Sequence, residues 1–389
     1  MMLAGNEAEA RLGKYKFDRT ISRPTLENFL SRAITQQDLL LGRGNFNDNL
    51  RMLRTVGAKF IGRSLCLWGW ESKLLDNLVI AKQRALVVHR VDPDIILQAC
   101  IFEIVTKEME QVPVPSWAFE AFGMTVAKRN FRYEDMLFAD GHAKNQWGAG
   151  ASVPDISRPE TQLLFYFLGV SFIDAGCEAI HLGQVEWIGR NDHDLNCYAK
   201  VLGKLRDYAV LHARRKMVLF DAHVPSGGLV RDGRLLLDFH SFPSRLVEVV
   251  DQPGAVRLQL GYADSLYGRS KGGRTFSGWS CEHLPYLVEL DNFGLAPHPG
   301  QPHQGIYVWG YDEMYWFARQ SAETRADFLA YADRWIRQHD TAGHLQMPGS
   351  RILAMPLHGE AWYYANRRSQ VVPGGWGDED VIRKIWVDR

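Results

Sequence analysis

The chain has 389 residues, too many for a peptide hormone or a minimal binding module and about the size of one elaborated α/β barrel or two modest domains. Lys plus Arg number 45 and Asp plus Glu number 45, so the formal net charge is zero, whereas nucleic-acid-binding proteins normally carry a basic excess. Hydrophobic residues make up 46% and charged residues 23%, a composition that excludes a disordered chain.

The cysteines and the apolar runs indicate the cellular setting. Five widely spaced cysteines form no C-x-x-C pair, so we expect buried free thiols in a reducing compartment. The N-terminal sequence MMLAGNEAEARLGKYKFDR lacks the apolar core of a signal peptide. The longest apolar run, Leu163 to Ile173, is far shorter than the roughly 20 residues of a membrane helix. We therefore expect a soluble cytoplasmic protein with neither a membrane nor a nucleic acid as partner.

Strand-length apolar runs alternate with longer helical patterns through most of the chain, which is typical of parallel β/α architecture. The eight predicted strands are, in chain order, residues 59–66, 95–103, 179–185, 217–221, 235–239, 256–261, 305–309 and 351–355. The predicted helices are residues 24–34, with Ser22 as the cap, and residues 74–89, 158–175, 195–214, 281–290 and 312–337.

Eight strands with intervening helices predict an α/β fold of the (β/α)8 TIM-barrel type. An open doubly wound sheet is the alternative, but no G-x-G-x-x-G motif opens a helix after the first strand. The link from Asp221 to Leu235 is too short and glycine-rich for a crossover helix, so we expect irregularity around strands four and five. We predict an N-terminal extension over residues 1–45 and a single catalytic barrel domain with long rim loops over residues 46–389.

Acidic residues follow the predicted strands, at the end of a barrel where active sites form. They are Glu103, Glu186, Asp221, Asp238, Asp312 and Glu313. Any one of them alone could cap a helix or pair with an arginine, but like charges gathered at one mouth cost stability unless function or a cation compensates. Paired carboxylates are what cleavage of a glycosidic bond requires. Glu186, next to Trp187, is the first choice for acid/base chemistry, Asp221 is its preferred partner, and Glu103 is third.

Aromatic and basic residues supply candidate substrate contacts at the same end. Trp68, Trp187 and Trp309 follow predicted strands, where their flat faces would suit sugar rings. Arg269 and Lys271 lie in a glycine-rich loop that could close over an acidic sugar. Arg63, in the first predicted strand, is a further candidate for substrate binding.

Two Asp-x-His pairs form a rival constellation. They are Asp221 with His223 and Asp238 with His240, and His181 lies on the third predicted strand. Because residues two apart in a strand share a face, each pair could offer a carboxylate and an imidazole to a divalent metal. A metal-dependent hydrolase, lyase or isomerase is therefore one alternative, and a non-catalytic glycan-binding barrel is another. The preferred hypothesis needs no cofactor, and His223, His240 and Asp238 then contact the carbohydrate substrate.

In its strand-end carboxylates and aromatic rim, the chain resembles the (β/α)8-barrel glycoside hydrolases over roughly residues 59 to 356. The resemblance implies a glycosidase active in carbohydrate metabolism or polysaccharide degradation. In the large retaining superfamily with that barrel, the two catalytic acids follow strands four and seven, which on the strand count above are positions occupied by Asp221 and Glu313. The Asn-Glu pair that is frequent in that superfamily is absent, since Val185 precedes Glu186.

Overall fold

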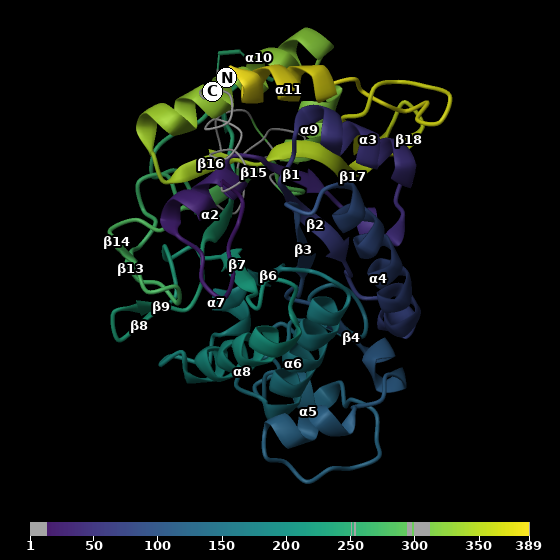
Figure 1. Cartoon of the computed structure of the whole chain (residues 1–389), viewed down its shortest axis with the longest axis vertical. Helices are drawn as coiled ribbons and strands as arrows, with labels where there is room; N and C mark the ends of the chain where they lie inside the picture. Colours follow the sequence, from purple (N-terminus) through teal and green to yellow (C-terminus); the bar gives the residue numbers. More distant parts are fainter. Residues whose placement is uncertain (1–13, 250, 253, 294–297, 299–311, 389) are drawn as a thin grey trace, which may run out of the picture.

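The computed structural model describes residues 14–249, 251–252, 254–293, 298 and 312–388. The fold is mixed α/β, with a mostly parallel central sheet and helices packed around it (Figure 1). The predicted α/β class is therefore confirmed.

The largest sheet has seven strands in the order β18-β17-β1-β2-β3-β6-β7. Its strands are β1 (Ala33–Gln36), β2 (Phe60–Cys66), β3 (Ile96–Cys100), β6 (Ala179–Gln184), β7 (Leu219–His223), β17 (Met347–Leu357) and β18 (Glu360–Tyr364). Neighbouring strands are parallel except for the antiparallel pair β17 and β18. Strands β1, β2, β3, β6 and β7 are buried along most of their length, as expected for a parallel sheet covered on both faces, whereas β18 at the edge is mostly accessible.

A second, three-stranded parallel sheet has the order β10-β15-β16. Its strands are β10 (His240–Pro243), β15 (Tyr286–Glu289) and β16 (Gly343–Leu345). Only Gln346 separates β16 from β17, and its backbone N–H donates to the carbonyl of Val288, 2.8 Å away. On the other side, the N–H of Asp238, just before β10, donates to the carbonyl of Phe220 in β7. The two sheets therefore adjoin each other along both edges of the smaller one.

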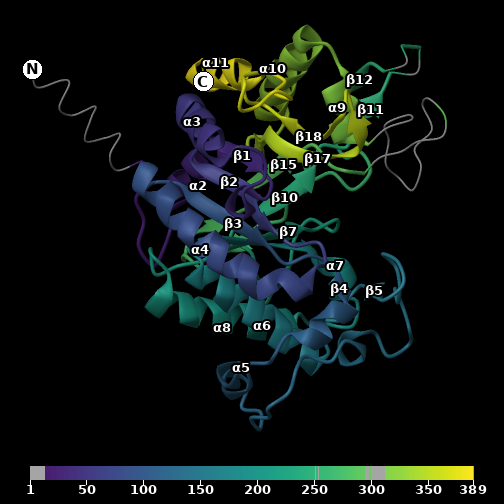
Figure 2. The same ribbon diagram turned by 90° about the vertical axis from the view of Figure 1, so that its right-hand side faces the viewer.

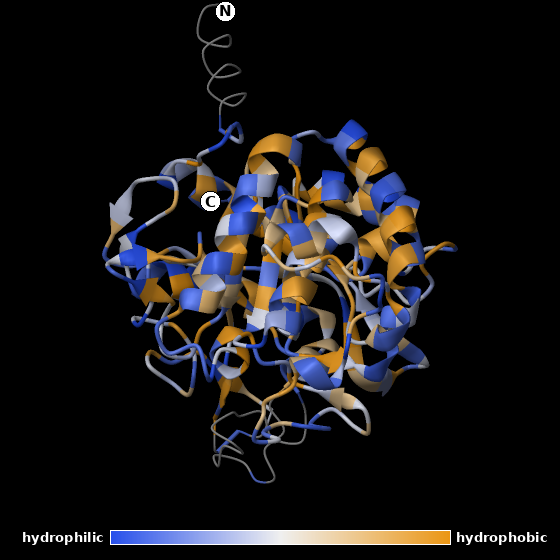
Figure 3. Ribbon diagram, turned by 90° about the horizontal axis from the view of Figure 1, so that it is seen from below, coloured by the Kyte–Doolittle hydropathy of each residue, from blue (hydrophilic) through white to orange (hydrophobic). Residues whose placement is uncertain are grey.

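Helices surround the strands (Figure 2), and Figure 3 shows helices that carry both hydrophilic and hydrophobic residues. They are α2 (Arg23–Leu30), α3 (Phe46–Val56), α4 (Leu74–Val91), α5 (Ser116–Ala121), α6 (Pro159–Asp174), α7 (Val185–Ile188), α8 (Asn196–His212), α9 (Glu313–Arg319), α10 (Ala322–His339) and α11 (Glu379–Val387). The hydroxyl of Ser22 accepts from the N–H of Thr25 and caps α2, as the sequence predicts. Within the described residues, no helix is long and apolar enough to cross a membrane.

Short strands lie in the loops. They are β4 (Val105–Thr106), β5 (Ala151–Ser152), β8 (Val230–Arg231), β9 (Arg234–Leu235), β11 (Val247–Glu248), β12 (Val256–Arg257), β13 (Gly273–Arg274) and β14 (Ser280–Cys281). The connection from β7 to β10 contains β8 and β9 and no helix, so the predicted irregularity is confirmed. Single-turn 3-10 helices span Leu39–Leu41, Glu71–Lys73, Lys107–Gln111 and Glu134–Met136.

Several predicted elements are wrong. The predicted helix 281–290 is β14 and β15, because a short apolar run fits a buried strand as well as a helix. The helix predicted over 24–34 ends at Leu30, and Ala33–Gln36 form β1 between β17 and β2. This part of the segment predicted to pack on the barrel thus lies inside the sheet.

Other boundaries shift. The predicted strand 256–261 pairs only over Val256–Arg257, with β11. The strand predicted at 235–239 is displaced, since the pairing segment is β10. The strand predicted at 305–309 lies outside the described residues. The helix predicted over 312–337 is two helices, because Gln320 has extended backbone and Ser321 caps α10.

Gly183, near the end of β6, offers a test of this packing. Its φ is +59°, and a Cβ there would collide with Oε2 of Glu103 and lie 3.1 Å from the Cα of Phe102. We expect Gly183→Ala to lower the free energy of unfolding by at least about 2 kcal/mol. The control, Gly203→Ala in α8, meets no atom within 4 Å and should raise stability by roughly 0.5–1 kcal/mol. Urea denaturation measures both, and equal effects would contradict the prediction.

Candidate functional site

Four side chains form a row across neighbouring parallel strands. Cys66 of β2 is in register with Cys100 of β3, Cys100 with His181 of β6, and His181 with Asp221 of β7. Residues paired in this way point to the same face of a sheet. The two thiol sulfurs lie 2.9 Å apart, and Nδ1 of His181 lies 2.7 Å from Oδ2 of Asp221. The row therefore places a His–Asp pair at one end and two free thiols at the other.

Gln98, on β3, ties this row to β2. Its amide Nε2 donates to Oδ1 of Asp221 over 2.7 Å, and its Oε1 accepts from the backbone N–H of Arg63 over 2.9 Å. Asp221 is fully buried, and both of its oxygens have partners. These contacts fix the orientation of the His181 ring.

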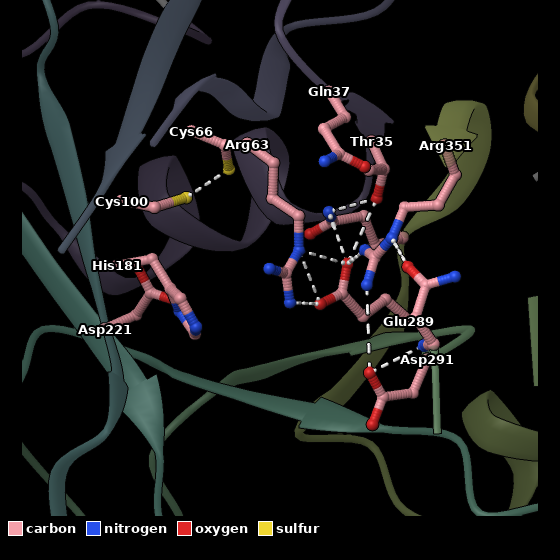
Figure 4. Close-up of polar contacts among 12 residues, drawn as sticks. Thr35, Gln37, Arg63, Cys66, Cys100, His181, Asp221, Glu289, Asp291 and Arg351 are labelled. Carbon is pink, nitrogen blue, oxygen red and sulfur yellow. Dashed lines mark hydrogen bonds and ion pairs between the residues drawn. The ribbon is translucent and has the colours of Figure 1, made fainter. Parts of the chain in front are cut away.

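Glu289, the last residue of β15, lies between two arginines (Figure 4). Nε of Arg63 donates to its Oε1 over 2.9 Å, and Nη1 of Arg351 donates to its Oε2 over 2.8 Å. The hydroxyl of Thr35, on β1, donates to Oε2 over 3.2 Å. Four strands, β1, β2, β15 and β17, thus contribute to one buried ionic cluster.

The charges of this cluster keep Glu289 ionised. Burial alone would raise the pKa of its carboxyl, but the positive charges of Arg63 and Arg351 and the hydrogen bonds from Arg63 hold the pKa well below its ordinary value. Arg63 also lies over the ring of Phe102, with 5.2 Å between guanidinium carbon and ring centroid. Its φ of +55° coincides with a shift of register between β2 and β3. The strand therefore departs from regular geometry at the residue that reaches Glu289.

A chain of alternating charges continues from this cluster. Arg351 lies 3.7 Å from Asp291, and Nη1 of Arg245 donates to Asp291 over 3.0 Å. Arg245 also pairs with Asp264, whose Oδ2 lies 3.2 Å from Nε2 of His223. Burial would raise the pKa of Asp264, but hydrogen bonds from His223 and Arg245 hold it well below its ordinary value. The loop that carries Asp264 is therefore anchored to the strand ends.

Asp38 follows β1 at the same end and has a left-handed backbone with φ of +58°. Its backbone N–H donates to the carbonyl of Arg63, and its Oδ1 accepts from the N–H of Cys66. Burial raises the pKa of Asp38 to about 6, against the opposing effects of that hydrogen bond and of the charge on Arg43. Asp38 is therefore a buried acid that titrates close to neutral pH.

A row of aromatic rings lies at the same end of the strands. The ring centroid of Trp68 is 5.3 Å from that of Phe102 and 5.1 Å from that of Trp147, which in turn is 5.6 Å from Trp187. Phe102 also contacts the ring of His181 edge-on, with centroids 5.9 Å apart. Trp68 is 45% exposed. Two of the predicted tryptophans, Trp68 and Trp187, thus belong to one continuous aromatic row.

Glu186 and Glu103 lie near β6. Glu186 is in the first turn of α7, directly after β6, and its Oε1 accepts from the N–H of Ser226 over 2.9 Å. It is half-buried. Glu103 is buried, and its Oε2 accepts from the N–H of Gln184 over 3.0 Å. Of the two carboxylates, Glu186 is the more accessible.

The second Asp-x-His pair is engaged elsewhere. Asp238 accepts from Arg206 of α8 and from the N–H of Phe220, each over 2.9 Å, so it ties β7 to a covering helix. Nδ1 of His240 lies 3.1 Å from the hydroxyl of Ser270. Burial, together with the charge of Lys271, lowers the pKa of His240 to about 3. Asp238 and His240 therefore have separate partners.

The remaining predicted residues have local partners or fall outside the description. Asp312 accepts from the N–H of Tyr315 and caps α9. Glu313 is buried and accepts from the hydroxyl of Ser244 and from two backbone N–H groups. Arg269 donates to carbonyls of its own loop, and the side chain of Lys271 is exposed. Trp309 lies outside the described residues.

Metal ligation has no support in the described residues, where no group of three or more His, Cys, Asp or Glu side chains is placed to hold a metal ion. Asp221 and His223 have different partners, His181 and Asp264. The Asp-x-His spacing alone therefore does not produce a metal site in this part of the chain.

The sequence analysis missed Glu289, the carboxylate that lies between two arginines. Glu289 is the sixth residue of LPYLVEL, a run that the sequence analysis assigns to a helix, so it does not count there among the strand-end acids. Arg351, Asp291 and Asp264 were missed as well, because their partners are distant in sequence. The signal in the sequence that could have identified Glu289 is the apolar run before it, which fits a strand as well as a helix.

No protein-family profile matches the chain, and no curated protein is significantly similar to it. The site therefore has to be interpreted from its own geometry.

The titration of Asp38 gives a prediction for stability against pH. Its pKa is higher in the folded protein than in the unfolded chain, so the folded state is favoured where Asp38 is protonated, and this contribution is lost as pH rises from about 4 through about 6. We expect Asp38→Asn, which keeps a residue tolerant of positive φ, to remove this loss and to stabilise the protein at pH 8 by about 2 kcal/mol.

Denaturation of both proteins at pH 4 and at pH 8 measures the effect. Asp18→Asn, at an acid whose side chain is 62% exposed, is the control and should change neither stability nor its pH dependence. The same pH dependence in wild type and Asp38→Asn would contradict the prediction.

Proposed function

We infer that the two sheets form one closed (β/α)8 barrel and that the protein is a glycoside hydrolase-like enzyme, which cleaves a glycosidic bond with a pair of carboxylates. The barrel is supported by the backbone hydrogen bonds on both sides of the smaller sheet, from Gln346 to Val288 and from Asp238 to Phe220. Its eight strands are then, in chain order, β1, β2, β3, β6, β7, β10, β15 and the continuous segment of β16 and β17.

The observation that carries the proposal is the position of two glutamates in this strand order. The fourth strand, β6, is followed by Glu186, and the seventh, β15, ends at Glu289. Strands four and seven carry the catalytic acids in the retaining superfamily that the chain resembles. The strand count from sequence alone put Asp221 and Glu313 at these places, because it omitted β1 and β15. It also included residues 256–261, which pair only over β12 and are not one of these eight strands, and residues 305–309, which lie outside the described residues.

Glu289 has the properties of the carboxylate that attacks the sugar. A nucleophile must be ionised, and Arg63 and Arg351 hold the pKa of Glu289 well below its ordinary value. Glu289 loses its negative charge when it forms a bond with the anomeric carbon. It regains that charge when water hydrolyses the bond, and both arginines then stabilise the carboxylate again. Arg63 and Arg351 are thus positioning residues for this step.

Glu186 is the proposed proton donor to the leaving oxygen. It is half-buried, which gives it access to a substrate, and its Oε1 is held by the N–H of Ser226. After the first step the same carboxylate removes a proton from the attacking water. The aromatic row of Trp68, Trp147 and Trp187 would provide stacking surfaces for sugar rings. A cytoplasmic location remains part of this proposal.

A glycosidase screen with two types of substrate tests the assignment. We expect Glu289→Gln to lose at least about 100-fold in kcat on both 4-nitrophenyl glycosides and oligosaccharides, because the nucleophile is missing. Glu186→Gln should lose far more on oligosaccharides than on 4-nitrophenyl glycosides, since nitrophenolate needs no protonation to leave. Azide should partly restore turnover of nitrophenyl glycosides by Glu289→Ala.

Glu282→Gln, at an exposed glutamate, is the matched control and should keep wild-type turnover. Wild-type kcat in both Glu289→Gln and Glu186→Gln would contradict the proposal. Sugars that bind but persist unconverted at every pH between about 4 and 9 would instead indicate a non-catalytic glycan-binding protein.

A further inference from the structure

Helix α4 presents its more apolar side to solvent. Its buried residues are Leu74, Ala81, Ala85 and Val88, two of which are small. Its exposed large apolar residues are Leu75, Val79, Ile80, Leu86, Val87 and Val91. A surface helix normally turns its apolar stripe toward the core, so this arrangement is the reverse of the usual one. The helix lies at the right-hand side of Figure 1 and in front of the sheet in Figure 2.

The exposed residues form a continuous face. Val79 is 60% exposed, Leu86 52% and Leu75 49%. Residues three, four and seven apart on a helix are neighbours, so these three line one side of the face, and Ile80, Val87 and Val91 line the other. Together they amount to an apolar surface on the order of a few hundred Å², about the size of the largest apolar patch on a typical monomer, which is often functional.

Polar residues run between the two apolar lines at intervals of seven. They are Asp76, Gln83 and Arg90, and all three are exposed. Residues seven apart lie on nearly the same side of a helix, so these side chains occupy the middle of the face. One end of the face therefore carries a negative charge and the other a positive charge.

The pattern is symmetric about Gln83. At equal numbers of residues before and after it lie Asp76 and Arg90, Ile80 and Leu86, Val79 and Val87, and Leu75 and Val91. A two-fold axis at Gln83 would bring each residue level with the other member of its pair on an antiparallel copy of α4. Apolar residues would then meet apolar residues, and Asp76 would meet Arg90 twice.

The same symmetry would set Lys82 level with Arg84, but this like-charge pair does not face the partner. Arg84 is turned inward, where Nη1 donates to the carbonyl of Leu40 and the guanidinium lies over the ring of Phe46. Lys82 lies at the edge of the face, where a long side chain can extend into water. The charges that remain in the middle of the face are complementary only in the antiparallel arrangement.

We propose that α4 is a homodimer interface, in which the helices of two copies pack antiparallel about a two-fold axis at Gln83. The face is smaller than the roughly 800 Å² per partner of a standard interface, so the dimer should dissociate reversibly in the micromolar range. The paired charges select the antiparallel register and a second copy of this chain as the partner, since a parallel pair would set Asp76 against Asp76.

Charge reversal on the full-length protein tests the proposal. Sedimentation velocity between about 1 and 200 µM should show a monomer–dimer equilibrium for the wild type. Asp76→Arg and Arg90→Asp should each raise the dimer dissociation constant at least about tenfold, because each sets two like-charge pairs across the interface. The double variant Asp76→Arg/Arg90→Asp should restore the dimer. Asp207→Arg, on α8, is the control and should leave association unchanged.

Crosslinking provides a second readout that does not depend on affinity. Gln83→Cys places a thiol on the proposed axis, so mild oxidation should link two copies, whereas Asp207→Cys, at an exposed position on α8, should not be linked. A wild-type monomer at every concentration would overturn the proposal, as would a dimer insensitive to both reversals. Monomers that bind anionic lipid vesicles through α4 would also overturn it and identify a membrane surface as the partner.

Discussion

The buried pairing of Glu289 with Arg63 and Arg351 is the interaction on which the arrangement of the strands depends. Glu289 ends β15 in the smaller sheet, whereas Arg63 and Arg351 belong to β2 and β17 in the larger one. A carboxylate removed from water is stable only when it is paired and hydrogen-bonded, so the two sheets must meet for the charge to be satisfied. The same requirement fixes the carboxylate in one orientation.

The pairing of Arg63 with Glu289 is accompanied by an unfavourable backbone conformation at Arg63. Arg63 has φ of +55°, a conformation disfavoured for residues with a side chain, and the register between β2 and β3 shifts beside it. Gln98 supports the irregular segment by accepting the N–H of Arg63 while it donates to Asp221. One amide side chain therefore couples the ionic cluster to the His181–Asp221 pair.

The sequence predicts long periodic elements well and short apolar ones poorly. Helices α4, α6 and α8 were predicted within a few residues because each is a long segment of four or more turns, which exceeds the usual length of a strand. β15 was assigned to a helix, since a run such as LPYLVEL does not distinguish the two structures. β1, with four residues, was absorbed into the preceding helix. Because of these two errors, the strands were numbered differently from those of the structure. Asp221 and Glu313, rather than Glu186 and Glu289, were therefore expected to follow strands four and seven.

The candidate site was only partly predictable for a different reason. Glu186, Asp221, His181, Trp68 and Trp187 were identifiable because they lie within or shortly after apolar runs that are in fact strands. Arg63 was also predicted, for substrate binding, but its pairing with Glu289 was not, since the two residues are 226 positions apart and no local pattern connects them. Likewise, the periodicity of α4 predicted a helix but not which of its sides faces the core, because that depends on the small residues Ala81 and Ala85 contacting the neighbouring elements.

The most direct test of the central claim is to locate a trapped glycosyl–enzyme intermediate. Wild-type protein would be treated with a 2-deoxy-2-fluoro glycoside carrying an activated leaving group and matching the sugar found in the screen, and its peptides would be analysed by mass spectrometry. The proposal predicts one glycosyl unit attached to the peptide that contains Glu289. Attachment at another carboxylate, or turnover that inverts the anomeric centre without any covalent adduct, would contradict it.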